Sequence, residues 1–337
     1  MVAAASHSGF VGKWGLRDND PQFGIEFMLD ATAHRPFVYR QLVPIVANYF
    51  DRLMSKKWRT YIALKLNPNK IFTKTASAKI KPNISFRYVV VYYLSFFALF
   101  LSLFILRLIL LDLGVGKIAA VYAPISFIIA FPYLQTVGGY FYDSTELFFL
   151  SLAFLCAVRG NFLLLLIIVL PATINKESFF FFVPTLFPVL RRTLSFKKSM
   201  IVMLTGLFIA GIVNVIIKIL FINSPGGVVV VNFWENLHNY LIPWSYMKAG
   251  ITFGVISPEG FFAGTLVVIV IIMLRGWSGC PCEVRRHLII SAIINFPLFL
   301  LFCATGELRN LSLMYVGFVI IMALIIDRDR KFVSDQE

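Results

Sequence analysis

Nine apolar segments separated by short polar turns fill most of the chain after residue 87. The segments hold almost no Asp, Glu, Lys or Arg, as the hydrocarbon core of a bilayer requires. A helix needs about 20 apolar residues to cross that core. The pattern therefore predicts an all-α, polytopic transmembrane helix bundle of about nine spans. We place these spans at 88–111, 118–137, 146–158, 161–174, 178–190, 199–222, 261–275, 288–304 and 311–326.

The composition supports a membrane protein and argues against nucleic-acid binding. Of the 337 residues, 59% are hydrophobic and only 14% are charged, whereas a soluble domain carries about a quarter charged residues. The formal net charge is +14, but 12 of the 31 Lys and Arg residues lie in short loops and a tail on one side of the spans. Anionic headgroups and the positive-inside rule explain basic residues there, so membrane lipids are the expected partner.

The same basic residues predict an orientation. The short loops on one side of the spans and the tail at 327–337 hold 12 Lys and Arg residues, and the opposite loops hold 3. This bias predicts that the C-terminus lies in the cytoplasm. Nine spans then place residues 1–87 outside, although they include 14 basic residues. Either the chain as given lacks a preceding span or one short segment does not cross, and we favour the former.

Three of the predicted spans are unusually short. The segments at 146–158, 161–174 and 178–190 have only 13 or 14 residues, which corresponds to about 20 Å of helix. Such helices end below the headgroups or border a water-filled cavity.

Two further regions are predicted to lie at the membrane surface. Residues 1–87 form a polar, basic segment, in which the apolar spacing over about 36–53 predicts an interfacial helix with Pro36 in its first turn. The loop at 223–260 is rich in aromatic residues and is predicted to form one or two amphipathic segments. The bundle proper would then extend over residues 88–326.

Three turns predicted to face the non-cytoplasmic side gather acids, amides and aromatic residues. Carboxylates near a low-dielectric boundary are costly unless they are paired or used for function. One interpretation is a set of ion pairs that locks the bundle, with Lys176 or Arg309 bound to Glu146 or Glu307. The other is a functional site. Its candidate residues are Tyr142, Asp143, Glu146, Lys176, Glu177, Glu307, Arg309 and Asn310.

Other candidates lie outside these turns. Asp18 and Asp20 could act as a general base towards a hydroxyl acceptor, or hold a divalent cation through carboxylate oxygens. The alternative is a turn, because Asp-Asn-Asp-Pro is typical turn sequence. Trp234 and His238 are candidates for substrate binding, although interfacial aromatic residues commonly serve as membrane anchors. No metal-ligand motif is evident, and a divalent cation is the one cofactor considered.

Four sequence blocks resemble those of a group of uncharacterised bacterial membrane proteins assigned to the GT-C class of glycosyltransferases. The blocks are Arg35-Pro-Phe-Val-Tyr-Arg40, Tyr142-Asp-Ser-Thr-Glu146, Asn175-Lys-Glu-Ser178 and Gly306-Glu-Leu-Arg-Asn310. The external N-terminal segment with its acids and the short helices also resemble that class. The resemblance implies an enzyme that moves a sugar from a polyprenyl-phosphate carrier to a cell-envelope glycan or lipid at the non-cytoplasmic face.

In such an enzyme a carboxylate deprotonates the acceptor hydroxyl, and arginines pair with the phosphate, because Arg is the better bidentate donor. The arginines would be Arg35, Arg40 and Arg309. Two other functions fit the same pattern: a transporter or channel whose acids line a substrate or proton path, and a non-catalytic assembly partner. The sequence implies no oligomeric state. The candidates for the catalytic carboxylate are Asp18, Asp20, Asp143 and Glu146.

Overall fold

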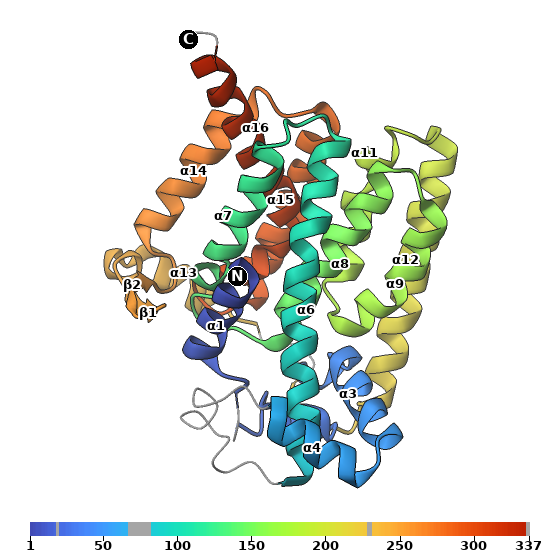
Figure 1. Cartoon of the computed structure of the whole chain (residues 1–337). Coiled ribbons are helices and arrows are strands. Elements are labelled where there is room, and N and C mark those ends of the chain that lie inside the picture. The colour runs from blue at the N-terminus through green and yellow to red at the C-terminus, as the bar shows by residue number, and fades with distance from the viewer. Residues whose placement is uncertain (18–19, 67–81, 228–230, 335–337) are drawn as a thin grey trace.

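The computed structural model describes residues 1–17, 20–66, 82–227 and 231–334. Its long helices stand side by side, with the C-terminus at one end of the bundle (Figure 1). Among the described residues, five helices are long and apolar enough to cross a membrane. A helical multi-pass bundle is thus confirmed as the fold class, while nine spans stays a prediction. The five are α6 (Pro82–Asp112), α8 (Phe141–Val158), α12 (Phe196–Leu220), α15 (Cys282–Phe302) and the stretch formed by η4 (Leu308–Met314) and α16 (Tyr315–Ser334).

The other predicted spans are also helical but shorter. They are α7 (Ala119–Leu134), α9 (Phe162–Asn175) and α14 (Ala263–Trp277). The segment predicted at 178–190 is broken into α10 (Phe179–Thr185) and α11 (Phe187–Leu190). Pro188 accounts for the break, because proline lacks the N–H of a helical bond and clashes with the preceding turn.

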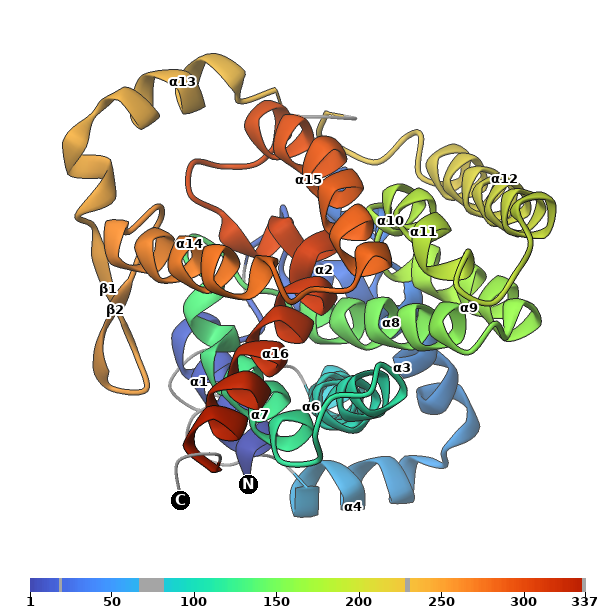
Figure 2. The same ribbon diagram turned by 90° about the horizontal axis from the view of Figure 1, so that it is seen from above.

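Helix α8 is the central helix of the bundle, and α12 lies at its edge. Seen from above, α6, α9 and α11 surround α8 (Figure 2). The most apolar 18-residue window of α8 is 83% buried, whereas that of α12 is 28% buried. Between Lys198 and Lys218 the exposed side chains of α12 are apolar, among them Leu204, Phe208 and Ile216. Helix α12 therefore suits contact with lipid, and α8 carries its polar residues into the protein interior.

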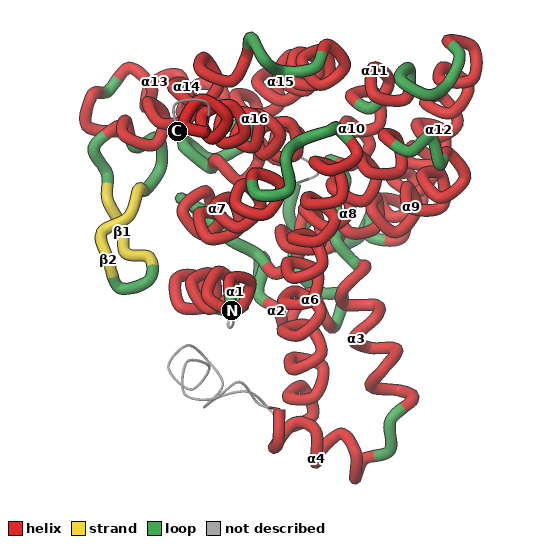
Figure 3. Tube along the Cα trace, turned by 45° about the horizontal axis from the view of Figure 1, so that its top comes forward, coloured by secondary structure: helices red, strands yellow, loops and turns green. Residues whose placement is uncertain are grey.

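The N-terminal segment packs against one side and one end of the bundle. Helix α1 contacts α6 and α7, and α4 lies crosswise at the end of α6 that is remote from the C-terminus (Figures 1 and 3). Neither α1 nor α4 was predicted, because neither shows a clear apolar periodicity. The elements of this segment are α1 (Val2–Trp14), α2 (Ile25–Leu29), η1 (Phe37–Tyr39), α3 (Leu42–Leu53) and α4 (Lys56–Leu66).

The predicted interfacial helix starts later than expected. Residues 37–39 form the separate turn η1, preceded by Pro36, and α3 begins only at Leu42. Val43 and Ala47 of α3 are buried against the bundle. The opposite side of α3 is exposed and mainly apolar, as suits a helix partly immersed in lipid. That exposed side consists of Ile45, Tyr49, Phe50 and Leu53, with Arg52 in the last turn.

The loop predicted at 223–260 contains two short helices, α13 (Phe233–Leu241) and η3 (Pro243–Tyr246), and a hairpin that was not predicted. Its strands β1 (Ala249–Thr252) and β2 (Val255–Pro258) are antiparallel, with Ala249 opposite Pro258. Phe253 and Gly254 join them with φ of 56° and 77°, as a two-residue hairpin turn requires. The predicted tail at 327–337 is helical through Ser334, because α16 continues.

Candidate functional site

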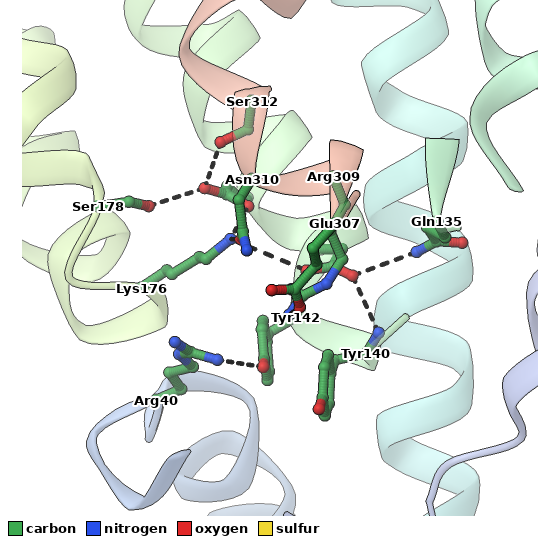
Figure 4. Close-up of polar contacts among 12 residues, drawn as sticks. Arg40, Gln135, Tyr140, Tyr142, Lys176, Ser178, Glu307, Arg309, Asn310 and Ser312 are labelled. Carbon is green, nitrogen blue, oxygen red and sulfur yellow. Dashed lines mark hydrogen bonds and ion pairs between the residues drawn. The ribbon is translucent and has the colours of Figure 1, made fainter. Parts of the chain in front are cut away.

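Polar residues from the three predicted turns lie together in one group (Figure 4). They come from the first turns of α8, from the junction of α9 and α10, and from η4 with the residue before it. An arginine from the N-terminal segment joins them. We call this group the polar cluster; it consists of Arg40, Tyr142, Asp143, Glu146, Lys176, Glu177, Glu307, Arg309 and Asn310.

Glu146 is the best-coordinated carboxylate of the polar cluster. Its Oε2 lies 2.7 Å from Nζ of Lys176. Its Oε1 accepts hydrogen bonds from the hydroxyls of Ser178 and Ser312, each at 2.8 Å. The Lys176 ammonium also donates to Oδ1 of Asn310 at 3.3 Å. Donors from three elements therefore fix Glu146, as a buried charge needs.

Asp143 has a similarly complete set of partners. Nη1 of Arg309 lies 2.9 Å from its Oδ1. The backbone N–H of Tyr140 and the amide of Gln135 donate to Oδ2 at 2.9 and 3.2 Å. The bond from Tyr140 satisfies a free N–H at the start of α8, so Asp143 also explains why the helix begins at Phe141. Arg309 donates further to Glu307, whose side chain is 13% exposed.

Arg40 connects the N-terminal segment to the cluster. Its guanidinium forms a bidentate pair with Glu177, with Nε–Oε2 and Nη2–Oε1 distances of 3.2 and 2.7 Å. It also donates to the hydroxyl of Tyr142. The ring of Tyr142 stacks on that of Tyr140, with centroids 5.1 Å apart. A backbone bond of 3.1 Å from Gln41 to the carbonyl of Ile174 holds Arg40 beside the end of α9.

The carboxylates of the polar cluster differ in exposure to solvent. The side chains of Asp143 and Glu146 are 2% and 5% exposed, whereas that of Glu177 is 31% exposed. Burial alone would raise the pKa of Glu177, but the charge and hydrogen bonds of Arg40 outweigh burial and lower this pKa to about 2. Glu177 is therefore ionised at neutral pH and is the carboxylate of the cluster that an external molecule can reach most easily.

Helix geometry gives the distance from the cluster to the opposite end of α8. Helices α6 and α8 run in parallel, because Ser95 contacts Phe141 at one end and Asp112 pairs with Arg159 at the other, with Nε–Oδ2 2.6 Å. From Arg159 to Glu146 the helix extends about 20 Å. That length is about two thirds of a hydrocarbon core about 30 Å thick.

The other predicted residues lie outside the cluster. Arg35 donates to the carbonyl of Gly226 at 2.6 Å and is the one predicted phosphate ligand placed elsewhere. Asp20 accepts a bond from the backbone of Gln22 at 2.8 Å, which matches the turn interpretation. Asp18 lies outside the described residues. Trp234 and His238 are exposed on α13, as membrane anchors would be.

Several side chains that donate hydrogen bonds to the buried carboxylates were not predicted from the sequence. Ser178 ends one of the four sequence blocks and Ser312 lies two residues after another, so proximity to a block was a usable signal. Gln135 gave no signal, because it stands at the end of an apolar helix and reaches Asp143 only through the fold.

Comparisons with known proteins assign no family to this chain. The chain matches no protein-family model, no curated protein and no solved structure. Within the part of the chain that the structure describes, no three His, Cys, Asp or Glu side chains are grouped to hold a metal ion. The site is therefore interpreted from its own geometry.

Proposed function

We propose that the chain is a membrane glycosyltransferase that moves a sugar from a polyprenyl-phosphate carrier to a hydroxyl of a cell-envelope glycan or lipid. The observation that carries this proposal is the bidentate pair of Arg40 and Glu177 at the accessible edge of a buried ionic cluster. A guanidinium that binds a carboxylate with two parallel bonds presents the same geometry to a phosphate.

The pair supplies two groups that such a transfer uses. The donor phosphate takes the place of Glu177 on Arg40. Glu177 then loses the partner that lowers its pKa and becomes a better base for the acceptor hydroxyl. The acceptor oxygen forms the new bond to the anomeric carbon, the bond from that carbon to the phosphate oxygen breaks, and the acceptor proton moves to Glu177.

The position of α3 supports a lipid-linked substrate. Arg40 lies two residues before α3, whose exposed side is mainly apolar and suits contact with the acyl region. A carrier held in the membrane would keep its phosphate close to this boundary. In this proposal Asp143 and Glu146, which the sequence ranked as candidate bases, hold Arg309 and Lys176 in place.

The test is transfer of a labelled sugar from a polyprenyl-phosphate donor by the purified full chain in lipid vesicles. We expect Arg40→Ala to lower the rate about 100-fold, a typical effect for a group acting in the transition state. Arg35→Ala is the matched control, because Arg35 belongs to the same sequence block and lies outside the cluster. Equal rates for the two variants would contradict the proposal.

A genetic experiment separates the enzyme from the transporter. Deletion of the gene should leave an envelope glycan or lipid without its terminal sugar. If deletion changes no glycan and the purified protein moves a solute along a gradient, the transferase proposal is wrong.

A further inference from the structure

The surface between α6 and α7 carries an apolar pocket of about 240 Å³. The two helices are antiparallel neighbours joined by the loop at 113–118, and α1 packs against both (Figure 3). Phe100, Phe104 and Val121 line the pocket and are exposed, so it opens at the outer surface of the bundle rather than in its interior. Drug-sized ligands occupy pockets of about 300–1,000 Å³. This smaller pocket therefore suits part of one acyl chain.

One residue of this otherwise apolar pocket is charged. Arg107 lines the pocket together with Phe100 and Phe104, and the three share one face of α6 because they are four and three residues apart. Arg107 is exposed, and it forms no ion pair with any residue that the structure describes. A guanidinium on an apolar, outward-facing helix surface is costly in a bilayer unless it contacts an anion or water. Arg107 therefore needs a partner from outside the chain.

Arg107 lies near one end of α6, and a second cation lies at the same end. The helix ends at Asp112, five residues or about 8 Å further along its axis. Lys117 lies four residues before Val121, in the loop that leads into α7. Lys117 is also exposed, and the described part of the chain provides it with no ion pair. The pocket thus combines apolar walls with two cations at one end, which matches a phospholipid with its acyl chain and phosphate.

The charges around this end of the pocket favour an anionic lipid. Two acids lie near the loop at 113–118, and each already has a cation. Asp112 pairs with Arg159 at 2.6 Å, and Asp327 pairs with Lys331 at 2.9 Å. The two cations of the pocket therefore keep this end positively charged. The loop also belongs to the side that the basic residues predict to be cytoplasmic, where anionic lipids are enriched.

We propose that this pocket binds an anionic phospholipid, with one acyl chain between α6 and α7 and the phosphate on Arg107 and Lys117. The guanidinium binds two phosphate oxygens, and the ammonium adds a second positive charge. Val2 and Ala3 of α1 also line the pocket, so the acyl chain contacts three helices. The polar cluster lies at the other end of α6, where Ser95 bonds to the start of α8. The lipid site therefore does not depend on the transferase proposal.

The test is binding of phosphatidylglycerol and of phosphatidylcholine, with the same acyl chains, to the purified full chain in detergent. Native mass spectrometry measures the lipid bound. We expect one tightly bound phosphatidylglycerol, and a melting temperature that rises with its concentration. Arg107→Leu should lower the affinity for phosphatidylglycerol about tenfold or more, the scale of a lost charge-assisted bond, and abolish the rise in melting temperature. Val121→Trp, which fills the pocket and keeps both cations, should weaken binding of both lipids.

The matched control is Lys218→Leu. Lys218 is also an exposed cation among apolar residues, but it lies on α12 and does not line the pocket. Its replacement should leave the affinity for phosphatidylglycerol unchanged. Equal affinity of the wild type for the two lipids, equal affinity of wild type and Arg107→Leu for phosphatidylglycerol, or competition by glycerol phosphate at the same concentration would overturn the proposal. If Val121→Trp does not fold, Arg107→Leu still decides the question.

Discussion

The polar cluster has two halves, both built on ion pairs, and the two halves differ in how exposed their carboxylates are. In one half, Asp143 and Glu146 are almost fully buried, and each accepts bonds from three donor groups. In the other half, Glu177 is about one third exposed and, among the side chains that the structure describes, is bound by Arg40 alone. The first half links α8, the start of α10 and η4, whereas the second links the bundle to the N-terminal segment.

This difference distinguishes carboxylates that stabilise the bundle from a carboxylate that can contact a ligand. A buried carboxylate with every oxygen occupied has no free site for a substrate, and removing one partner leaves a costly unpaired charge. In the other half only Glu177 is partly exposed, so water can solvate its carboxylate when a ligand replaces it on the buried Arg40. Under the proposed function, the buried half stabilises the bundle and the exposed half contacts the ligand.

The largest effect is expected from breaking the buried half. Lys176→Met leaves Glu146 buried without its cation, and we expect a loss of about 3–5 kcal/mol in the free energy of unfolding. Chemical denaturation in detergent measures it. The double variant Lys176→Met with Glu146→Gln should recover most of the loss, since it removes both charges. No recovery would show that packing of Lys176 matters more than its charge.

The next effect concerns activity. Glu177→Gln should lower sugar transfer about 100-fold. Its amide oxygen can still accept a bond from the buried Arg40 guanidinium, so we expect a smaller loss of stability than for Lys176→Met. Asp143→Asn and Glu146→Gln should instead lower expression and melting temperature, with activity falling only in proportion to folded protein. Normal folding with a 100-fold loss in either of these two variants would place the general base in the buried half after all.

A smaller effect on stability is expected when the pH is lowered. The folded pKa of Glu177, about 2, lies below its ordinary value of 4.5. Its contribution to stability is therefore complete above about pH 4.5 and is lost as the pH falls towards 2. The difference in denaturation midpoint between wild type and Glu177→Gln should shrink between pH 5 and pH 2–3, where the wild-type carboxyl becomes protonated. A difference independent of pH would disprove the role of the charge.

The smallest effect is expected from cysteine labelling, which should change neither stability nor activity. It tests on which side of the membrane the exposed half lies. Trp234 and Ser195 are both exposed, and the predicted topology places them on opposite sides. A cysteine at 234 should react with a membrane-impermeant reagent added outside intact cells, and one at 195 should react only after lysis. Labelling of residue 195 from outside would reverse the orientation, and with it the side on which Glu177 meets its substrate.

The convergence of the three turns was predictable, because short turns between antiparallel spans place their charges at one end of a bundle. The predicted pairings of Lys176 with Glu146 and Arg309 with Glu307 occur. The ion pair between Arg40 and Glu177 was not predictable, since it joins residues 137 positions apart through the path of the N-terminal segment. The β hairpin was missed because its strands are four residues long and lack a strong alternation.

We expect the position of α3 to make the Arg40 pair sensitive to the thickness of the bilayer. The helix has a mainly apolar exposed side, and the residue two positions before it carries the guanidinium that binds Glu177. A thicker or thinner bilayer would move the level at which Ile45, Tyr49 and Phe50 are immersed, at a cost of a fraction of a kcal/mol per Å. We therefore expect acyl-chain length to tune the geometry of the Arg40 pair, so that the lipid acts as an effector. Unchanged transfer rates across vesicles of different acyl-chain length would refute this coupling.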